Sequence, residues 1–161
     1  MIRIAATAVP TALLTAVALA PVPSEAAPAE ARPAGLTAGR YQHQAFEATN
    51  RVRRQHERAG FRAQDCLQRF AERQARRMAR QDRMFHQELR PILRQCGLTT
   101  TGENVAYGFP TGRSVVNDGW MNSEDHRENI LDRDFRLMGI GARRSADGTW
   151  YAAQVFGGRT R

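Results

Sequence analysis

The segment Trp120-Met121-Asn122-Ser123-Glu124-Asp125-His126-Arg127-Glu128-Asn129-Ile130-Leu131 says more about the fold than any other part of the chain. Its second half predicts a short helix over residues 124–131, in which His126 and Ile130 are spaced i, i+4 and share a face. An apolar residue on that face can anchor the helix to a core while the imidazole beside it stays available. The segment therefore combines a structural anchor with a titratable group.

Blocks of similar content lie on both sides of this segment. Upstream are Met84-Phe85-His86 and Gly102-Glu103-Asn104-Val105-Ala106-Tyr107-Gly108, and downstream are Gly139-Ile140-Gly141 and Tyr151-Ala152-Ala153-Gln154-Val155-Phe156-Gly157. The series resembles the CAP (SCP-like) superfamily, which includes cysteine-rich secretory proteins, antigen 5 and plant pathogenesis-related proteins, and it is similar to the secreted bacterial branch. The resemblance covers roughly residues 43–157. It implies an α+β fold, a three-layer α-β-α sandwich with a small antiparallel sheet.

The resemblance also implies a site. His86 and Glu103 would line a central cleft, and His126 matches the histidine of the bacterial block Ser-Pro-Gly-His-Arg-x-Asn-Ile-Leu. The eukaryotic tetrad of two histidines and two glutamates is not intact here, because a serine stands where its second glutamate would be. Glu124 and Asp125 replace the usual Pro-Gly, and either carboxylate could substitute for that glutamate. Acidic residues also favour a helix N-terminus for structural reasons alone.

Two imidazoles and one carboxylate suit several kinds of chemistry. Neutral histidines with a carboxylate can bind Zn²⁺ or another divalent cation and leave one coordination position open. A secreted metal-dependent hydrolase, peptidase-like, is then one alternative, although the chain lacks the H-E-x-x-H helix of zinc proteases. A His/Glu pair could also act in general acid–base catalysis, or the three side chains could form a buried hydrogen-bonded cluster. The residues do not decide whether the chain is an enzyme.

The first part of the chain predicts export. Residues 1–26 read as a signal peptide, with a positive start, an uncharged apolar run and cleavage before Ala27; a membrane anchor is the alternative. Residues 27–40, rich in Ala, Pro and Gly, read as a flexible leader, and residues 41–161 as one domain. No later stretch is apolar enough to span a bilayer. We therefore expect a secreted, extracellular protein, which could stay associated with the cell wall.

The chain is strongly basic. It carries a formal net charge of +8, and all 24 of its basic residues are arginines, which together with abundant alanine indicates a bacterial origin. A surface of this charge attracts polyanions. For an exported protein the expected partners are an unknown lipid, sterol, metal or anionic cell-wall ligand rather than nucleic acid. An envelope-associated domain that binds anionic polymer through its Arg-rich face is therefore a further alternative, and we expect a monomer.

Cys66 and Cys96 are the only cysteines. In an oxidising compartment two cysteines most simply form one disulfide. A metal or nucleophile role is the alternative, but neither cysteine belongs to a C-x-x-C pair. We therefore predict a Cys66–Cys96 disulfide.

Local patterns predict helices first and a hairpin last. Expected helices cover residues 42–58, the amphipathic stretch that follows Asp65 as N-cap, residues 91–95, residues 115–121 with Ser114 as N-cap, and residues 124–131. A turn is expected over residues 99–102 and a strand over 103–107. Two alternating runs, 136–144 and 149–156, are joined through Asp147-Gly148 and predict a hairpin. This order indicates an α+β fold.

Overall fold

The sheet forms the middle layer of the protein. The computed structural model describes residues 35–159, in which the strands are β1 (Arg62–Ala63), β2 (Thr100–Tyr107), β3 (Leu137–Arg144) and β4 (Trp150–Gly158). Their order is β1-β3-β4-β2. β4 is antiparallel to both of its neighbours, as expected of a small antiparallel sheet, and the two-residue strand β1 adds a parallel pairing with β3 that the sequence did not predict. A parallel pair needs a long crossover, and here residues 64–136, which include β2 and helices of both faces, connect β1 to β3.

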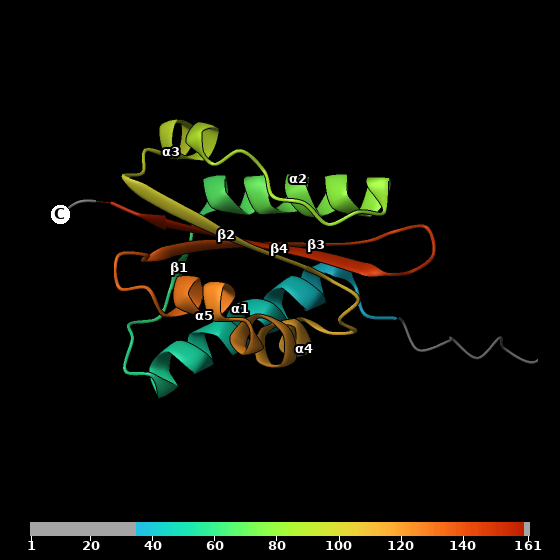
Figure 1. Ribbon diagram of the computed structural model, residues 1–161, viewed down its shortest axis with the longest axis horizontal. Helices are drawn as coiled ribbons and strands as arrows, with labels where there is room; N and C mark the ends of the chain where they lie inside the picture. The colour runs from blue at the N-terminus through green and yellow to red at the C-terminus, as the bar shows by residue number, and fades with distance from the viewer. Residues whose placement is uncertain (1–34, 160–161) are drawn as a thin grey trace, which may run out of the picture. The chain divides into compact units, whose positions relative to one another are not determined.

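Helices cover both faces of the sheet, which confirms the α-β-α sandwich (Figure 1). On one face lie α2 (Asp65–Gln81) and α3 (Arg90–Cys96). On the other lie α1 (Ala38–Gln55), α4 (Gly112–Ser114) and α5 (Glu124–Leu131), with a π-helical turn η1 (Val115–Gly119) and a 3-10 turn η2 (Trp120–Asn122) between α4 and α5. Buried apolar clusters fill the space on each side of the sheet.

The close packing of α2 on β3 depends on glycine. The buried residues of α2 recur at helical spacing, as the sequence pattern predicts. They meet β3 where a Cβ on Gly139 would lie 2.3 Å from the backbone N of Gln68, and one on Gly141 would lie 2.1 Å from the carbonyl oxygen of Ala71. Only residues without a Cβ allow the helix backbone to approach the strand so closely.

Several predicted boundaries are wrong, because other side chains cap the helices. Thr37 caps α1, so this helix begins at Ala38, inside the 27–40 range expected to be a leader; residues 1–34, with the predicted signal peptide, lie outside the described part of the chain. Gln64, not Asp65, caps α2 by accepting a hydrogen bond from the N–H of Leu67 at 2.7 Å.

The middle of the chain also departs from its predicted elements. Residues 100–102, expected in a turn, begin β2, since they pair with residues 156–158 of β4. Thr111 caps α4 in a reciprocal capping box with Ser114. The chain then winds through η1 and η2, so no single helix covers residues 115–121. The helix over residues 124–131 and the terminal hairpin are confirmed.

The predicted disulfide is confirmed. Cys66, in the first turn of α2, is bonded to Cys96, the last residue of α3, and their Cα atoms are 5.6 Å apart. This bond joins the two helices on one face of the sheet.

On the opposite face a buried arginine ties α1 to α5. Arg53 is fully buried and donates hydrogen bonds to the carbonyls of Ala59 (2.7 Å), Ile130 (2.6 Å) and Asp132 (2.9 Å). Its guanidinium also lies 3.9 Å from the ring centroid of Phe61. Burial lowers the pKa of Arg53 to about 10, with smaller contributions from neighbouring arginines, so the group remains charged at neutral pH. Arg53 thereby fixes the C-terminal end of α5.

Candidate functional site

Two of the predicted site residues are in direct contact. The loop between α2 and α3 carries His86 to Glu103 on β2, where Nδ1 of His86 lies 2.9 Å from Oε2 of Glu103. The backbone N–H of Gln87 donates to the same oxygen at 3.1 Å, and its side-chain amide donates to Oε1 at 2.6 Å. Sequence reasoning missed Gln87, since nothing in a lone amide beside a histidine signals that it will bond both oxygens of a distant carboxylate.

The two partners differ in exposure. The side chain of Glu103 is almost fully buried (1% exposed), while that of His86 is 60% exposed. Burial raises the pKa of the Glu103 carboxyl, and the hydrogen bonds from Gln87 and His86 oppose that rise. When Glu103 is ionised, the Nδ1–H group of His86 donates a hydrogen bond to the carboxylate. The second ring nitrogen, Nε2, is then left to face solvent or a ligand.

His126 is held in place through the backbone of α5. The side-chain amide of Asn104 donates to the carbonyl of His126 at 3.0 Å, and Asn129 donates to the amide oxygen of Asn104, also at 3.0 Å. Asn104 bonds Gln154 on β4 as well. Because Asn104 follows Glu103 directly on β2, this network sets where α5 lies relative to the carboxylate.

The imidazole of His126 is half-buried. Burial lowers the pKa of His126, the charge that His86 can carry lowers it further, and Asp125 acts in the opposite direction. Positive charges on the two imidazoles therefore oppose each other. The two imidazoles come from different layers: His86 from the α2–α3 loop and His126 from α5, on either side of β2, an edge strand of the sheet.

The two accessory candidates lie beside this site. Glu124 and Asp125 are exposed in the first turn of α5, where carboxylates interact favourably with the helix dipole. Both oxygens of Glu103 are bonded by the His86–Gln87 loop. The structural role of an acidic pair at a helix N-terminus is thus sufficient to explain the position of Glu124 and Asp125, and Asp125 also favours a charged His126.

A largely apolar cleft opens next to His126. Its volume is about 230 Å³, and it is lined by Met84, Val105, Ala106, Tyr107, Phe109, Gly119, Trp120, Ser123 and His126. Trp120 closes its inner wall by donating its indole N–H to the carbonyl of Val105 at 3.3 Å. Met84 and Tyr107, 44% and 55% exposed, are the exposed large hydrophobic residues of the described chain, and both lie at this cleft.

The donor set fits a metal ion only in part. Within residues 35–159, no group of three or more His, Cys, Asp or Glu side chains is arranged to hold one. Oε2 of Glu103 already accepts two hydrogen bonds and Oε1 accepts one, so this carboxylate is better suited to orient His86 than to bind metal itself. The free donors are Nε2 of His86 and the ring of His126.

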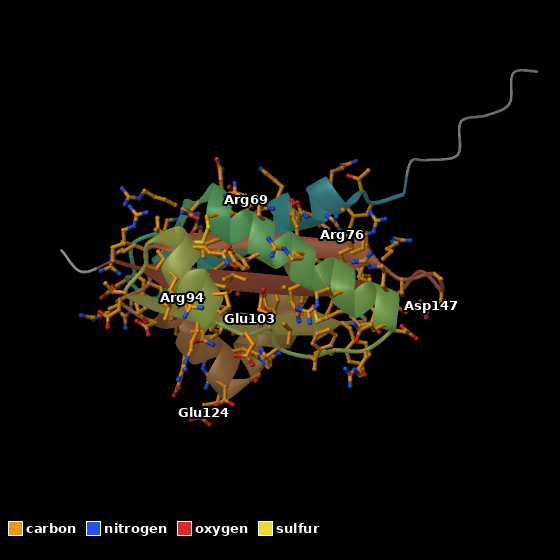
Figure 2. All side chains as sticks on the ribbon, turned by 90° about the horizontal axis from the view of Figure 1, so that it is seen from above. Arg69, Arg76, Arg94, Glu103, Glu124 and Asp147 are labelled. Carbon is orange, nitrogen blue, oxygen red and sulfur yellow. A yellow bond between two sulfur atoms is a disulfide. The ribbon has the colours of Figure 1, made fainter. Side chains whose placement is uncertain are left out.

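The predicted Arg-rich face lies elsewhere, on the outer side of α2. Arg69 and Arg76 project from this helix in Figure 2, and both are exposed. Among residues 35–159 no helix is long and apolar enough to cross a membrane.

An α-β-α sandwich with a histidine–glutamate pair at an edge strand is a combination that defines a class of protein. Comparison with known proteins identifies this class. Residues 46–156 match the family described as "CAP: Cysteine-rich secretory protein family", and the chain belongs to this family. The protein YkwD of Bacillus subtilis, described as uncharacterized, is 52% identical over 42 residues, which are 26% of this chain and 16% of YkwD. The uncharacterized membrane protein YlbC of the same species is 44% identical over 43 residues, 27% of this chain and 12% of YlbC. The aligned part is therefore a small fraction of either relative.

Solved structures share the fold. An extracellular protein containing an SCP domain from Bacillus anthracis is 25% identical, with a TM-score of 0.65 over 76% of this chain and 41% of that one. An outer surface protein from Borrelia burgdorferi is 21% identical, with a TM-score of 0.64 over 71% of this chain and 90% of that one. The second likeness concerns the fold alone.

Proposed function

We propose that this protein is an extracellular binding module that holds a small, largely apolar ligand in the cleft beside His126. The cleft carries the proposal: its wall is formed by aliphatic and aromatic side chains, and one titratable group, His126, lies among them. Ligand sites of this kind combine a mostly apolar lining with a few polar groups that fix orientation. Location outside the cell is supported by the predicted signal peptide, by the disulfide and by the extracellular relative from Bacillus anthracis.

The geometry limits the kind of ligand. A ligand with an apolar body and one hydroxyl or carboxylate group, such as a sterol or a fatty acid, could bury its body against Trp120 and Phe109 and place its polar end at His126. The exposed Met84 and Tyr107 at the cleft would then be covered, which adds hydrophobic stabilisation of about 25 cal/mol for each Å² removed from water.

Calorimetric titration with palmitate and with a soluble sterol derivative tests this function. The wild-type protein should bind one of the two probes, and Tyr107→Ser should weaken that binding by removing apolar contact. His126→Gln should weaken it by removing the ring nitrogen, whereas His43→Gln, at an exposed position on α1, should not. If neither probe binds, or if both histidine variants behave alike, the cleft is not the ligand site.

We also propose that Nε2 of His86, which does not line the cleft, and the ring of His126, which does, together accept a divalent cation such as Zn²⁺. The supporting observation is that Glu103 binds Nδ1 of His86, an arrangement that holds the ring in one tautomer and leaves Nε2 free as a ligand. The lowered pKa of His126 favours the neutral imidazole that metal binding requires. Solvent would have to complete the coordination, so we expect weak binding.

Calorimetry with Zn²⁺ tests this second proposal. His86→Gln and His126→Gln should each abolish binding, Glu103→Gln should weaken it less, and acidification should release the ion, because a protonated imidazole cannot bind metal. If Zn²⁺ does not bind near neutral pH, the cation proposal fails. The metal-dependent hydrolase alternative then fails with it, because that chemistry needs the ion.

A further inference from the structure

A second hollow, lined by arginines, lies at the opposite edge of the sheet from the cleft. Its volume is about 770 Å³, and its lining is Ala59, Gly60, Arg62, Gln64, Arg133, Asp134, Arg136, Leu137 and Arg159. We call it the basic pocket. It adjoins β1 and the first residue of β3, whereas the cleft adjoins β2, the other edge strand. Four arginines and one aspartate therefore share one opening, which segments far apart in the sequence form together.

The arginines of the basic pocket are not neutralised by the rest of the described chain. The ion pair in residues 35–159 is the one between His86 and Glu103, so none of these guanidiniums is paired with a carboxylate there. Arg136 donates to the carbonyl of Phe135 at 3.0 Å and Arg159 to that of Cys96 at 3.4 Å, which leaves most of their N–H groups free.

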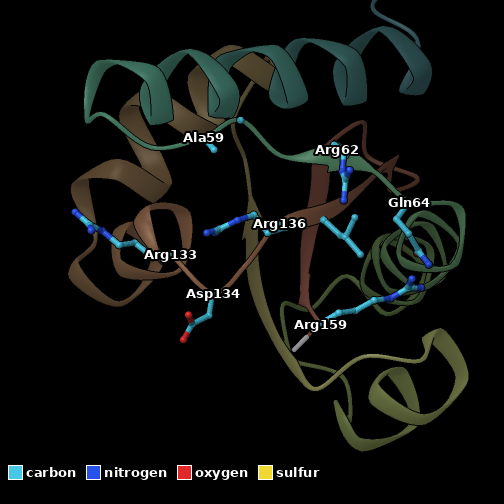
Figure 3. A pocket seen from close by; sticks show the side chains of 9 residues that line it. Ala59, Arg62, Gln64, Arg133, Asp134, Arg136 and Arg159 are labelled. Atoms are coloured by element: carbon cyan, nitrogen blue, oxygen red, sulfur yellow. The ribbon is translucent and has the colours of Figure 1, made fainter. Parts of the chain in front are cut away.

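A buried charge adds to the potential of the basic pocket. Arg53 is near enough to Arg136 for the charge of Arg136 to contribute to the lowered pKa of Arg53. Figure 3 shows Arg62 and Arg136 extending into the opening, with Arg159 beside Gln64 on one side and Arg133 at the other edge. Like charges gathered in a concave surface raise the local concentration of anions.

We propose that the basic pocket binds a short chain of phosphate groups. Guanidinium forks match phosphate oxygens, and each phosphate can accept from more than one fork. The pocket is larger than one phosphate needs, and Arg133 and Arg159 lie on different sides of it, so anionic groups at more than one position fit best. No aromatic side chain lines the pocket to stack on bases, which argues against nucleic acid. The exposed hydrophobic residues Met84 and Tyr107 lie at the cleft instead, which argues against docking on a lipid surface at this point.

Calorimetric titration of the full chain with tripolyphosphate, in a phosphate-free buffer of low ionic strength, tests the proposal. The double variant Arg62→Gln/Arg136→Gln should lower affinity by at least about ten-fold, because the loss of even one charge-assisted hydrogen bond costs roughly that factor. Its matched control is Arg69→Gln/Arg76→Gln, which changes the net charge equally on the outer face of α2 and should change affinity by less than about three-fold. Equal losses in the two double variants would overturn the proposal, since they would show that only overall charge matters.

Further measurements identify the chemical source of the ligand and distinguish a lost contact from a misfolded variant. An oligomer of glycerol phosphate in place of tripolyphosphate tells an organic phosphate chain from an inorganic one, and binding of either supports the pocket. A single-stranded oligonucleotide that binds more tightly than both, with the same dependence on Arg62, would overturn the phosphate-chain assignment. Arg62→Lys keeps the charge but not the fork, so a reduced affinity in this variant, with an unchanged unfolding temperature, supports recognition by the guanidinium geometry.

Discussion

Replacing Arg53 by methionine should destabilise the protein severely. The change keeps a long, apolar stem but removes the donors that bond the carbonyls of Ala59, Ile130 and Asp132. It also removes the guanidinium that lies against Phe61. Each buried carbonyl left without a partner costs about 1–3 kcal/mol, and part of this is recovered because a charged group no longer has to be buried. We expect a net loss of about 3–5 kcal/mol.

Urea unfolding followed by circular dichroism measures this loss. Arg54→Met is the matched control, because Arg54 is the next residue of the same helix and is exposed. It should change stability by less than about 0.5 kcal/mol. Because domains of this size are stable by about 5–15 kcal/mol, the Arg53 variant should also unfold at a temperature roughly 10 °C or more below wild type. If the two variants differ by less than about 1 kcal/mol, the carbonyls find other partners and the reasoning fails.

Three further predictions concern the rest of the fold. Reducing the disulfide between Cys66 and Cys96, which are 30 positions apart, should lower the free energy of unfolding by roughly 3–4 kcal/mol, measured in denaturant with and without reductant. His126→Gln should make the metal-free protein less sensitive to acid: because the folded pKa of His126 lies below its ordinary value of 6.5, the unfolded state binds the proton more readily, and wild-type stability should fall as the pH drops through 6.5. A variant that loses as much stability as wild type on acidification would contradict this. Gly141→Ala should cost about 3 kcal/mol or more in denaturant unfolding, since its Cβ would meet the carbonyl of Ala71 at 2.1 Å; a loss under about 1 kcal/mol would mean that α2 can shift freely.

Much of the fold could be predicted because its signals are local. The apolar stripe of α2 and the hairpin turn at Asp147-Gly148, where Gly148 has a φ of +91°, depend on residues close in sequence. Helix starts were harder to place. Thr37 is a preferred type of N-cap residue but lies in the Ala-, Pro- and Gly-rich stretch expected to be a leader, and Gln64 is not of a type that favours the N-cap. The parallel pairing of β1 with β3 had no signal at all, since two residues carry no hydrophobic period.

The site could be predicted less completely. The family resemblance brought His86 and Glu103 together as cleft residues, and the structure places them in hydrogen-bonding contact. Their spacing alone could not have done so, because a loop and a strand of another layer supply them. The role of Arg53 could not be predicted, because two of the carbonyls that it bonds lie at the C-terminal end of α5, 77 and 79 positions further along the chain. The basic pocket was equally hidden, since Arg62 and Arg136 meet only through the β1–β3 pairing.

The position of the disulfide has a consequence for the reactivity of the site. Residue 86 lies between Cys66 and Cys96 in the sequence, so the bond encloses His86 within a covalent ring made of α2, α3 and the loop between them. Glu103 lies outside that ring, on β2. With the bond closed, a ligand that displaces His86 from Glu103 can move the imidazole only as far as the ring allows. With the bond reduced, the loop is held at the strand by its hydrogen bonds to Glu103 and by the packing of Phe85 against the core, so His86 and Glu103 should separate more readily than in the oxidised protein.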